Sequence, residues 1–255
     1  MIEVRDVILP ELTGDETRRA YIYVPEEAQF DNELRFPVLY MFHGHNVFFD
    51  EDATYGKSWG MREYLEAHHV PLIVAAVECN HAPNNARLSE YAPYSFSSPR
   101  FGSIKGQGPL TMDWLIHCFK PEIDRSFPTK PDREHTFIAG SSMGGLMSLY
   151  ALCCFNQVFS RAAALSPSVS FDTNSLRSMI RTADIAADTV LYMDMGESEL
   201  RWHNTMRTFW SIGRLLLERG VRVTARIVPG GEHCEASWEK QIPFFLPALL
   251  YELED

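Results

Sequence analysis

The stretch Gly140-Ser141-Ser142-Met143-Gly144 decides the fold of this chain. Residues 136–139 before it form a short apolar run that predicts a buried strand, and residues 146–155 after it predict an apolar helix. A strand, a tight turn and a helix therefore meet at Ser142, which is the setting of a nucleophile elbow. The two flanking glycines leave room for a strained turn that lifts the hydroxyl above the sheet edge. Ser142 is the candidate nucleophile.

A glycine-rich turn of this kind also occurs by chance, and the alternative is that Ser142 only caps a helix. Catalysis differs from capping because a serine hydroxyl needs an imidazole base, itself oriented by a carboxylate. The histidines that follow Ser142 are His203 and His233. His233 ends the loop Pro229-Gly230-Gly231-Glu232-His233 just after a predicted strand, whereas His203 opens a predicted helix. His233 is therefore the predicted base.

The acid is expected after the strand predicted at residues 190–195, where Asp194, Glu197 and Glu199 compete. Asp194 lies within the end of the strand, so the direction of its side chain is open. Glu199 lies in the loop beyond it. We favour Glu199 as the acid and keep Asp194 as the second candidate.

Catalysis through a serine nucleophile also needs N–H donors for the oxyanion. The backbone N–H of Met143, directly after the nucleophile, is the first expected donor. The second is expected from His43-Gly44-His45-Asn46, which follows an apolar run, and either His45 or Asn46 can supply it. His43 and His45, followed by Asp50 and Asp52, also suggest a metal, but no third ligand stands out, so we predict none and assign His43 a structural role.

Apolar runs and helical patterns alternate along the rest of the chain. The runs at residues 36–42 and 71–77 lack period-two alternation, which suits strands covered on both faces. Further elements are expected as a hairpin of strands 2–9 and 19–25 around Thr13-Gly14-Asp15, strands 162–165, 190–195 and 222–228, and helices 58–68, about 111–123, 203–219 and about 236–251. The pattern predicts one α/β domain over residues 1–255, with a mostly parallel sheet, helices on both faces and an N-terminal antiparallel hairpin.

Residues 79–110 interrupt the alternation as a long irregular insertion. Because the insertion follows a strand, it is expected to project over the carboxyl edge of the sheet, where open α/β sheets bind ligands. The alternative is a surface excursion that packs on itself. Side chains predicted to line a substrate pocket are Phe48, Trp59, Arg87, Tyr91 and Trp202, with Phe49, Tyr94 and Phe96 as further candidates.

Composition narrows the class of protein. The net charge of −11 and the pI near 5.3 argue against a surface for nucleic acid or anionic membrane, which requires concentrated Lys and Arg. No apolar run reaches the length of a membrane span, and residues 1–6 lack a signal-peptide pattern, so a cytoplasmic location is expected. The five cysteines form no disulfide or metal pattern and predict reduced, mostly buried thiols.

Together these residues resemble the putative esterase family of α/β-hydrolases, the esterase D-like group that includes feruloyl esterases, S-formylglutathione hydrolases, siderophore esterases and mycolyltransferases. The resemblance is carried by stretches along nearly the whole chain: residues 21–25, 40–48, 55–60, 90–93, 120–124, 139–146, 165–167 and 231–233, with Trp238. It implies an α/β-hydrolase fold, Ser142 as nucleophile, His233 as base and an acid in Gly196-x-x-Glu199. Glutamate as the acid departs from the commoner pattern, as does His45 where glycine is frequent.

The predicted function is serine-dependent hydrolysis of a carboxylic ester, a small acyl or aryl ester, through an acyl-enzyme and without a cofactor. A small-molecule ester is the expected partner, and a homo-oligomer stays open. Three alternatives remain: an acyltransferase with the same triad, a siderophore-type esterase that uses Arg87, Arg100 and Arg201 for an anionic ligand, and a non-catalytic α/β-hydrolase scaffold.

Overall fold

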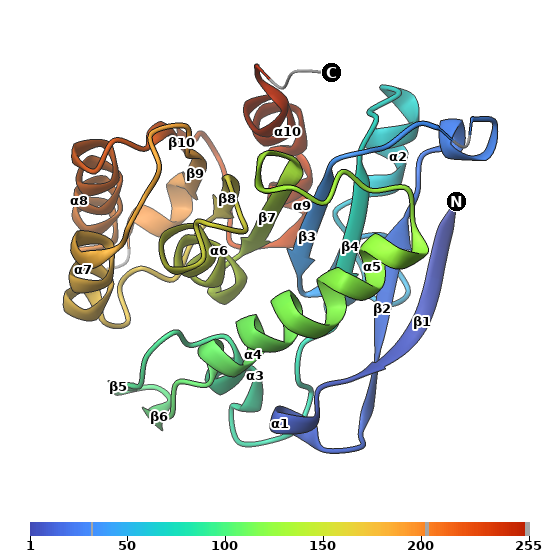
Figure 1. Cartoon of the computed structure of the whole chain (residues 1–255). Coiled ribbons are helices and arrows are strands. Elements are labelled where there is room, and N and C mark those ends of the chain that lie inside the picture. The colour runs from blue at the N-terminus through green and yellow to red at the C-terminus, as the bar shows by residue number, and fades with distance from the viewer. Residues whose placement is uncertain (32, 202–203, 253–255) are drawn as a thin grey trace.

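The computed structural model describes residues 1–31, 33–201 and 204–252, and its centre is an eight-stranded sheet (Figure 1). The strand order is β1-β2-β4-β3-β7-β8-β9-β10. The strands are β1 Ile2–Ile8, β2 Thr17–Tyr23, β3 Val38–Phe42, β4 Ile73–Val77, β7 Thr136–Ser141, β8 Arg161–Leu165, β9 Val190–Gly196 and β10 Arg222–Val228. β2 is antiparallel to both of its neighbours, and the pairs from β4 to β10 are parallel. The mostly parallel sheet and the N-terminal antiparallel pair are confirmed.

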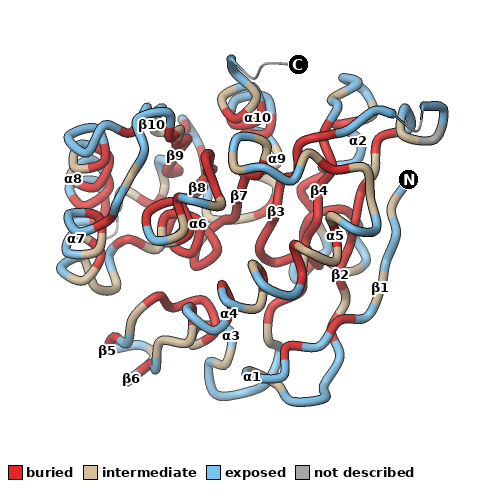
Figure 2. Tube along the Cα trace, viewed as in Figure 1, coloured by how far each residue is buried: buried red, intermediate tan, exposed pale blue. Residues whose placement is uncertain are grey.

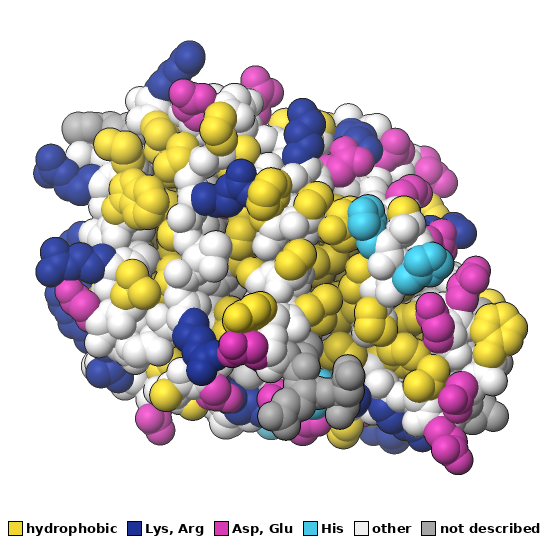
Figure 3. All heavy atoms as spheres, turned by 90° about the horizontal axis from the view of Figure 1, so that it is seen from above, with side chains coloured by type: hydrophobic (Ala, Val, Ile, Leu, Met, Phe, Trp, Pro, Cys, Tyr) yellow, Lys and Arg dark blue, Asp and Glu magenta, His cyan; other side chains and the backbone are white. Residues whose placement is uncertain are grey.

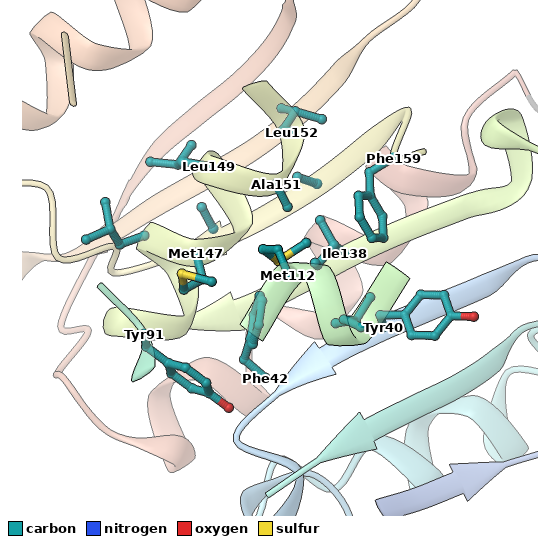
Figure 4. Close-up of a cluster of buried hydrophobic side chains, with 14 of the residues drawn as sticks. Tyr40, Phe42, Tyr91, Met112, Ile138, Met147, Leu149, Ala151, Leu152 and Phe159 are labelled. Atoms are coloured by element: carbon teal, nitrogen blue, oxygen red, sulfur yellow. The ribbon is translucent and has the colours of Figure 1, made fainter. Parts of the chain in front are cut away.

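Both faces of the central strands are buried, as the apolar runs predicted (Figure 2). Along β3, Tyr40 and Phe42 belong to one core cluster, whereas Leu39 and Met41 belong to the other. Figure 4 shows residues of the first cluster, in which Phe42 lies near Met112 and Tyr40 packs edge-on against Phe159. Neighbouring residues of a strand point to opposite faces, so a strand that is apolar throughout has to be covered on both sides.

Helices supply that cover on each face. The first cluster takes in residues of α4 Gly108–Trp114, α5 Lys120–Ser126, α6 Met143–Cys154, α7 Thr173–Thr182 and α8 Thr205–Glu218. The second takes in residues of α2 Met61–Ala67, α9 Glu235–Glu239 and α10 Ile242–Leu250. The expectation of helices on both faces is thus confirmed.

Several predicted helix boundaries were wrong. The helix expected at about 236–251 is two helices, α9 and α10, interrupted at Lys240 and Gln241. The helix expected at about 111–123 runs from α4 through a π-helical segment, Leu115–Phe119, into α5. Pro121 lies at the start of α5 and has no N–H to donate to the preceding turn, so the regular α-helical hydrogen bonds are interrupted there.

Other elements were not expected. α7 was missed because only Leu176 and Ile180 are buried in an otherwise polar segment. The insertion at 79–110 is partly regular, since it contains α3 Ala86–Glu90 and the hairpin of β5 Phe96–Ser98 and β6 Gly102–Ile104. A short helix, α1 Pro10–Thr13, occupies the start of the predicted polar turn.

The described surface carries acidic, basic and apolar side chains side by side on the face shown in Figure 3. Among the described residues, no helix combines the length and apolar character needed to cross a membrane. Two of the five cysteines, Cys79 and Cys153, are buried, so the expectation of mostly buried thiols was wrong.

Candidate active site

The elbow residue Ser142 joins β7 to α6 in a strained conformation, with φ 56° and ψ −119°. Such a backbone is rare for a residue with a side chain and is a mark of functional turns. The glycines allow it: a Cβ on Gly140 would stand 2.7 Å from the backbone of Gly144, and one on Gly144 would stand 2.9 Å from Phe42 Cβ. The predicted strand, turn and helix therefore meet as an elbow requires.

Three polar side chains from separate loops form one hydrogen-bonded line. His233 Nε2 lies 2.9 Å from Ser142 Oγ, and His233 Nδ1 lies 2.6 Å from Glu199 Oε2. Glu199 follows β9 and His233 follows β10. These two strands are parallel to each other and to β7, the strand that ends at the elbow, from which β8 separates them. Their carboxyl ends share one edge, which is why residues 91 positions apart can meet.

The carboxylate of Glu199 is held on both oxygens. Its Oε1 accepts hydrogen bonds from the Ser166 hydroxyl at 2.6 Å and from the Gly196 N–H at 2.9 Å. Ser166 Oγ in turn accepts a hydrogen bond from Trp238 Nε1 at 3.1 Å. Burial opposes ionisation of Glu199 most strongly, but the hydrogen bonds from His233, Ser166 and Gly196 together lower its pKa below the ordinary value. The group is therefore an anion facing the imidazole.

The second candidate acid, Asp194, takes another place. Its Oδ2 accepts from the Tyr192 hydroxyl at 3.0 Å and its Oδ1 from the Ser166 N–H at 3.2 Å. Burial raises the pKa of Asp194 to about 7. The third candidate, Glu197, accepts from the Gly230 N–H at 2.8 Å and so ties the β9 loop to the β10 loop. The structure pairs His233 with Glu199, and not with either of these.

The backbone N–H groups expected to bind an oxyanion differ in whether they already have a hydrogen-bond acceptor. The Met143 N–H lies at the start of α6 and has no hydrogen-bond acceptor within the described part of the chain. The Asn46 N–H donates to the His43 carbonyl at 2.9 Å, whereas no acceptor for the His45 N–H occurs among the residues described. Of the two candidates in this loop, His45 is thus the one whose N–H remains available.

Buried side chains pack against the loop of residues 43–46. The His43 N–H donates to the Tyr91 hydroxyl at 3.3 Å, and the two rings lie 4.9 Å apart. Burial lowers the pKa of His43 well below its ordinary value, and burial followed by the nearby His81 lowers that of His45 to about 4. Both rings are therefore neutral at ordinary pH. Tyr91 therefore stabilises the position of this loop through its contacts with His43.

A cavity of about 530 Å³ opens onto the elbow. It is lined by Arg87, Leu88, Ser98, Arg100, Phe101, Ser142, Met143, Ser166, Pro167, Ser168, Ser170, Phe171, Met195, Glu199, Thr205 and His233. The insertion thus contributes walls of this cavity, among them Arg87.

Other pocket predictions do not match this lining. Phe48, Trp59 and Tyr91 are between 2% and 3% exposed and pack in the core, because large apolar rings gain more from full burial than from a cavity wall. Trp202 and His203 lie outside the described residues. Sequence reasoning missed Phe101, Phe171 and Ser166 as site residues. Of these, Ser166 had a signal, because Leu165-Ser166-Pro167 directly follows a predicted strand.

The acids of the rejected metal hypothesis have other partners. Asp50 accepts from the Ser58 N–H and hydroxyl, and Asp52 pairs with Arg19 at 2.7 Å. Within the described residues, the group that could together ligate a metal ion is His45, Cys79 and His81. None of these three side chains lines the cavity.

The parallel sheet, the elbow after its central strand and the loops that gather at one edge define an α/β-hydrolase. The model of the family described as "Putative esterase" matches residues 13–249, so the chain belongs to that family and is a carboxylic ester hydrolase.

A known protein is similar to this chain in sequence, and solved structures are similar to it in fold. The "Uncharacterized protein YbbA" of Bacillus subtilis (strain 168) is 24% identical over 187 residues, which is 72% of this chain and 70% of that protein. An IroE-like serine hydrolase from Shewanella oneidensis superposes with a TM-score of 0.74 at 18% identity, over 98% of this chain and 79% of the other. An S-formylglutathione hydrolase from Agrobacterium tumefaciens does so with 0.71 at 14% identity, over 100% and 96%.

Proposed function

We propose that this esterase works through an acyl-enzyme on Ser142. His233 takes the hydroxyl proton as Ser142 attacks the ester carbonyl, and returns it to the departing alcohol. Water then attacks the acyl group with the same base, and the acid is released. Glu199 orients the imidazole and stabilises the imidazolium that forms. The unbroken line from Ser142 Oγ through His233 to Glu199 is the observation that carries this proposal.

Two N–H groups are proposed to hold the oxyanion. Met143 presents its N–H at the start of α6, where the helix dipole also favours negative charge. The His45 N–H faces no other acceptor among the described residues, which favours it over Asn46. Asn46 instead braces the loop, since its side chain bonds Glu235 and Thr54.

The proposed substrate is a small acyl or aryl ester. The aromatic rings of Phe101 and Phe171 offer an apolar wall, and their centroids lie 6.0 Å apart. Arg87 and Arg100 line the same cavity, and guanidinium groups bind carboxylates well. These two arginines favour an ester that carries an anionic group, which keeps the siderophore-type alternative open.

The test is a panel of p-nitrophenyl esters, short and long acyl, aryl and sugar-linked, assayed with wild type, Ser142→Ala and His233→Ala. Turnover of short or aryl esters by wild type, with nearly complete loss in both variants, is the expected result. Addition of an alcohol acceptor separates an acyltransferase, which would form a new ester, from a hydrolase. A folded wild type that turns over no ester would contradict the proposal.

A further inference from the structure

A second group of chemically active side chains lies beside the oxyanion loop. β3 and β4 are parallel neighbours, with Phe42 paired with Val77, so the loops that follow them start at the same edge. His45 lies in the first loop, and Cys79 and His81 lie in the second. Their potential ligand atoms all lie within 4.8 Å of one another.

The hydrogen bonds around His45 are satisfied when its Nε2 carries the ring proton. The Thr54 N–H can only donate, so the atom it meets at 2.9 Å is the side-chain amide oxygen Oδ1 of Asn46. The Thr54 hydroxyl lies 3.2 Å from the same oxygen and donates its proton there. In this arrangement the hydroxyl accepts from His45 Nε2, which lies 3.1 Å away and carries the ring hydrogen.

The other ring nitrogen is left with a lone pair. A neutral imidazole protonated at Nε2 is unprotonated at Nδ1. His45 Nδ1 is buried and has no hydrogen-bond partner in the described residues, and the side chain belongs to a residue only 4% exposed. Buried polar atoms are rarely left in this state, because the lost hydration is not replaced. The lone pair of His45 Nδ1 is therefore available to an electron-pair acceptor such as a metal ion.

We propose that His45, Cys79 and His81 bind a divalent transition-metal ion of the zinc class, with His45 bound through Nδ1. Two imidazoles and a thiolate suit such borderline ions, and three protein ligands leave a fourth position for water. The Cys79 thiol gives up its proton to solvent on binding. The Nε2–H that His45 donates to Thr54 is the kind of outer hydrogen bond that orients a ligating imidazole.

The geometry needs only a small closure. Bond lengths of about 2.0 to 2.3 Å place neighbouring ligand atoms of a tetrahedral zinc site roughly 3.3 to 3.6 Å apart. Atoms within 4.8 Å of one another reach that spacing by a shift of roughly 1 Å. His81 is exposed and can make most of the shift, whereas His45 and Cys79 are buried and hold the deep side of the site.

The bound ion would join two loops of the sheet edge. Gly44 precedes His45, and a Cβ there would stand 2.8 Å from the Val77 backbone, so the loops already pack closely. Because none of the three ligands lines the reaction cavity, the ion acts on the loop that carries the His45 N–H and not on the substrate.

The test is a titration of chelator-treated protein with Co²⁺ followed by absorbance. Wild type is expected to bind one Co²⁺ with a thiolate charge-transfer band and visible bands of tetrahedral cobalt. Cys79→Ser should lose the charge-transfer band, and His81→Ala should bind at least tenfold more weakly. The double variant His117→Ala/Cys118→Ser removes an adjacent His and an exposed Cys elsewhere and should behave as wild type.

Zinc-dependent thermal stability gives a second readout. Zn²⁺ should raise the Tm of wild type and of the double variant, but raise that of His81→Ala much less, because binding to the folded state alone stabilises it. Absence of a thiolate band in wild type, or bands equal in wild type and Cys79→Ser, would overturn the proposal. The measurement needs no turnover, so its outcome is independent of the proposed acyl-enzyme.

Discussion

At the scale of single residues, the site depends on how Glu199 is held. It is 1% exposed, yet it stays ionised because donors surround both of its oxygens. A neutral amide in its place would still fit the space but would present the wrong partner to the imidazolium that forms during catalysis.

We predict that Glu199→Gln lowers kcat on the order of 10⁴-fold while the protein stays folded, because the carboxylate acts mainly on the protonated imidazole. Steady-state kinetics with a p-nitrophenyl ester measure it. The matched control is Glu197→Gln, since the Gly230 N–H can still donate to the amide oxygen there. Equal losses in the two variants would contradict the assignment of the acid.

The arginines of the cavity make a prediction about selectivity. Arg87→Ala is expected to raise KM roughly tenfold for an aryl ester with a free carboxylate, and to leave KM for its neutral analogue nearly unchanged. The control is Arg214→Ala on the exposed face of α8, where the ion pair with Glu218 is open to solvent. If both esters respond equally to Arg87→Ala, Arg87 does not act by charge.

At the scale of elements, the elbow requires close approach of α6 to the loop after β3. We predict that Gly144→Ala destabilises the protein by about 1 to 3 kcal/mol and reduces kcat/KM, because the added methyl meets Phe42 Cβ at 2.9 Å and His43 Nδ1 at 3.2 Å. Urea unfolding and the ester assay measure the two effects.

Gly213→Ala in α8 is the control, since its Cβ meets Met193 Sδ at an ordinary 3.4 Å. Alanine also suits a helix better than glycine, so this variant should be neutral or more stable by up to about 1 kcal/mol. If Gly144→Ala is as stable and active as wild type, the elbow accommodates a methyl group at this position, and the predicted steric conflict is wrong.

The elements that could be predicted are those with a strong local signal. The apolar runs of β3, β4 and β7 and the turn at Ser142 are such signals, and the fold built on them is confirmed. α7 has two buried residues in ten, and the break between α9 and α10 falls just before Pro243, which starts α10 and could not continue a single helix. Both had a sequence signal that was overlooked: Leu176, Met179 and Ile180 have helical spacing over little more than one turn, and Pro243 marks a helix start.

At the scale of the whole molecule, one buried acid couples stability to pH. Burial raises the pKa of Asp194 to about 7, against an ordinary value of 3.8. Between these values the folded chain keeps a proton that the unfolded chain releases, so this group makes stability fall as pH rises from about 4 to about 7. Above about pH 7 the stability that protonated Asp194 contributes is fully lost.

Asp194→Asn cannot titrate, so we predict that its stability falls less over this range. Relative to wild type the variant should gain up to roughly 2 to 3 kcal/mol between pH 5 and pH 7. Urea unfolding at several pH values measures this gain, with the exposed Asp184→Asn as control. Parallel curves for wild type and Asp194→Asn would refute the coupling.

Some residues of the site could be predicted from the sequence, and others only from the three-dimensional arrangement of the whole chain. The sequence order of nucleophile, acid and base limits the choices for Ser142 and His233, and the structure brings both to Glu199. The core positions of Phe48 and Trp59 could not be predicted, because residue type does not tell a cavity wall from a core side chain. Cys79 and His81 were missed because only the pairing of β3 with β4 brings them to His45.

The most direct test of the central claim is to locate the covalent intermediate. Wild type, Ser142→Ala and His233→Ala are treated with a fluorophosphonate ester, and the adduct is located by mass spectrometry of peptides. We predict one adduct, on Ser142, absent in Ser142→Ala and formed far more slowly in His233→Ala. An adduct on another residue, or full ester turnover by Ser142→Ala, would contradict the account.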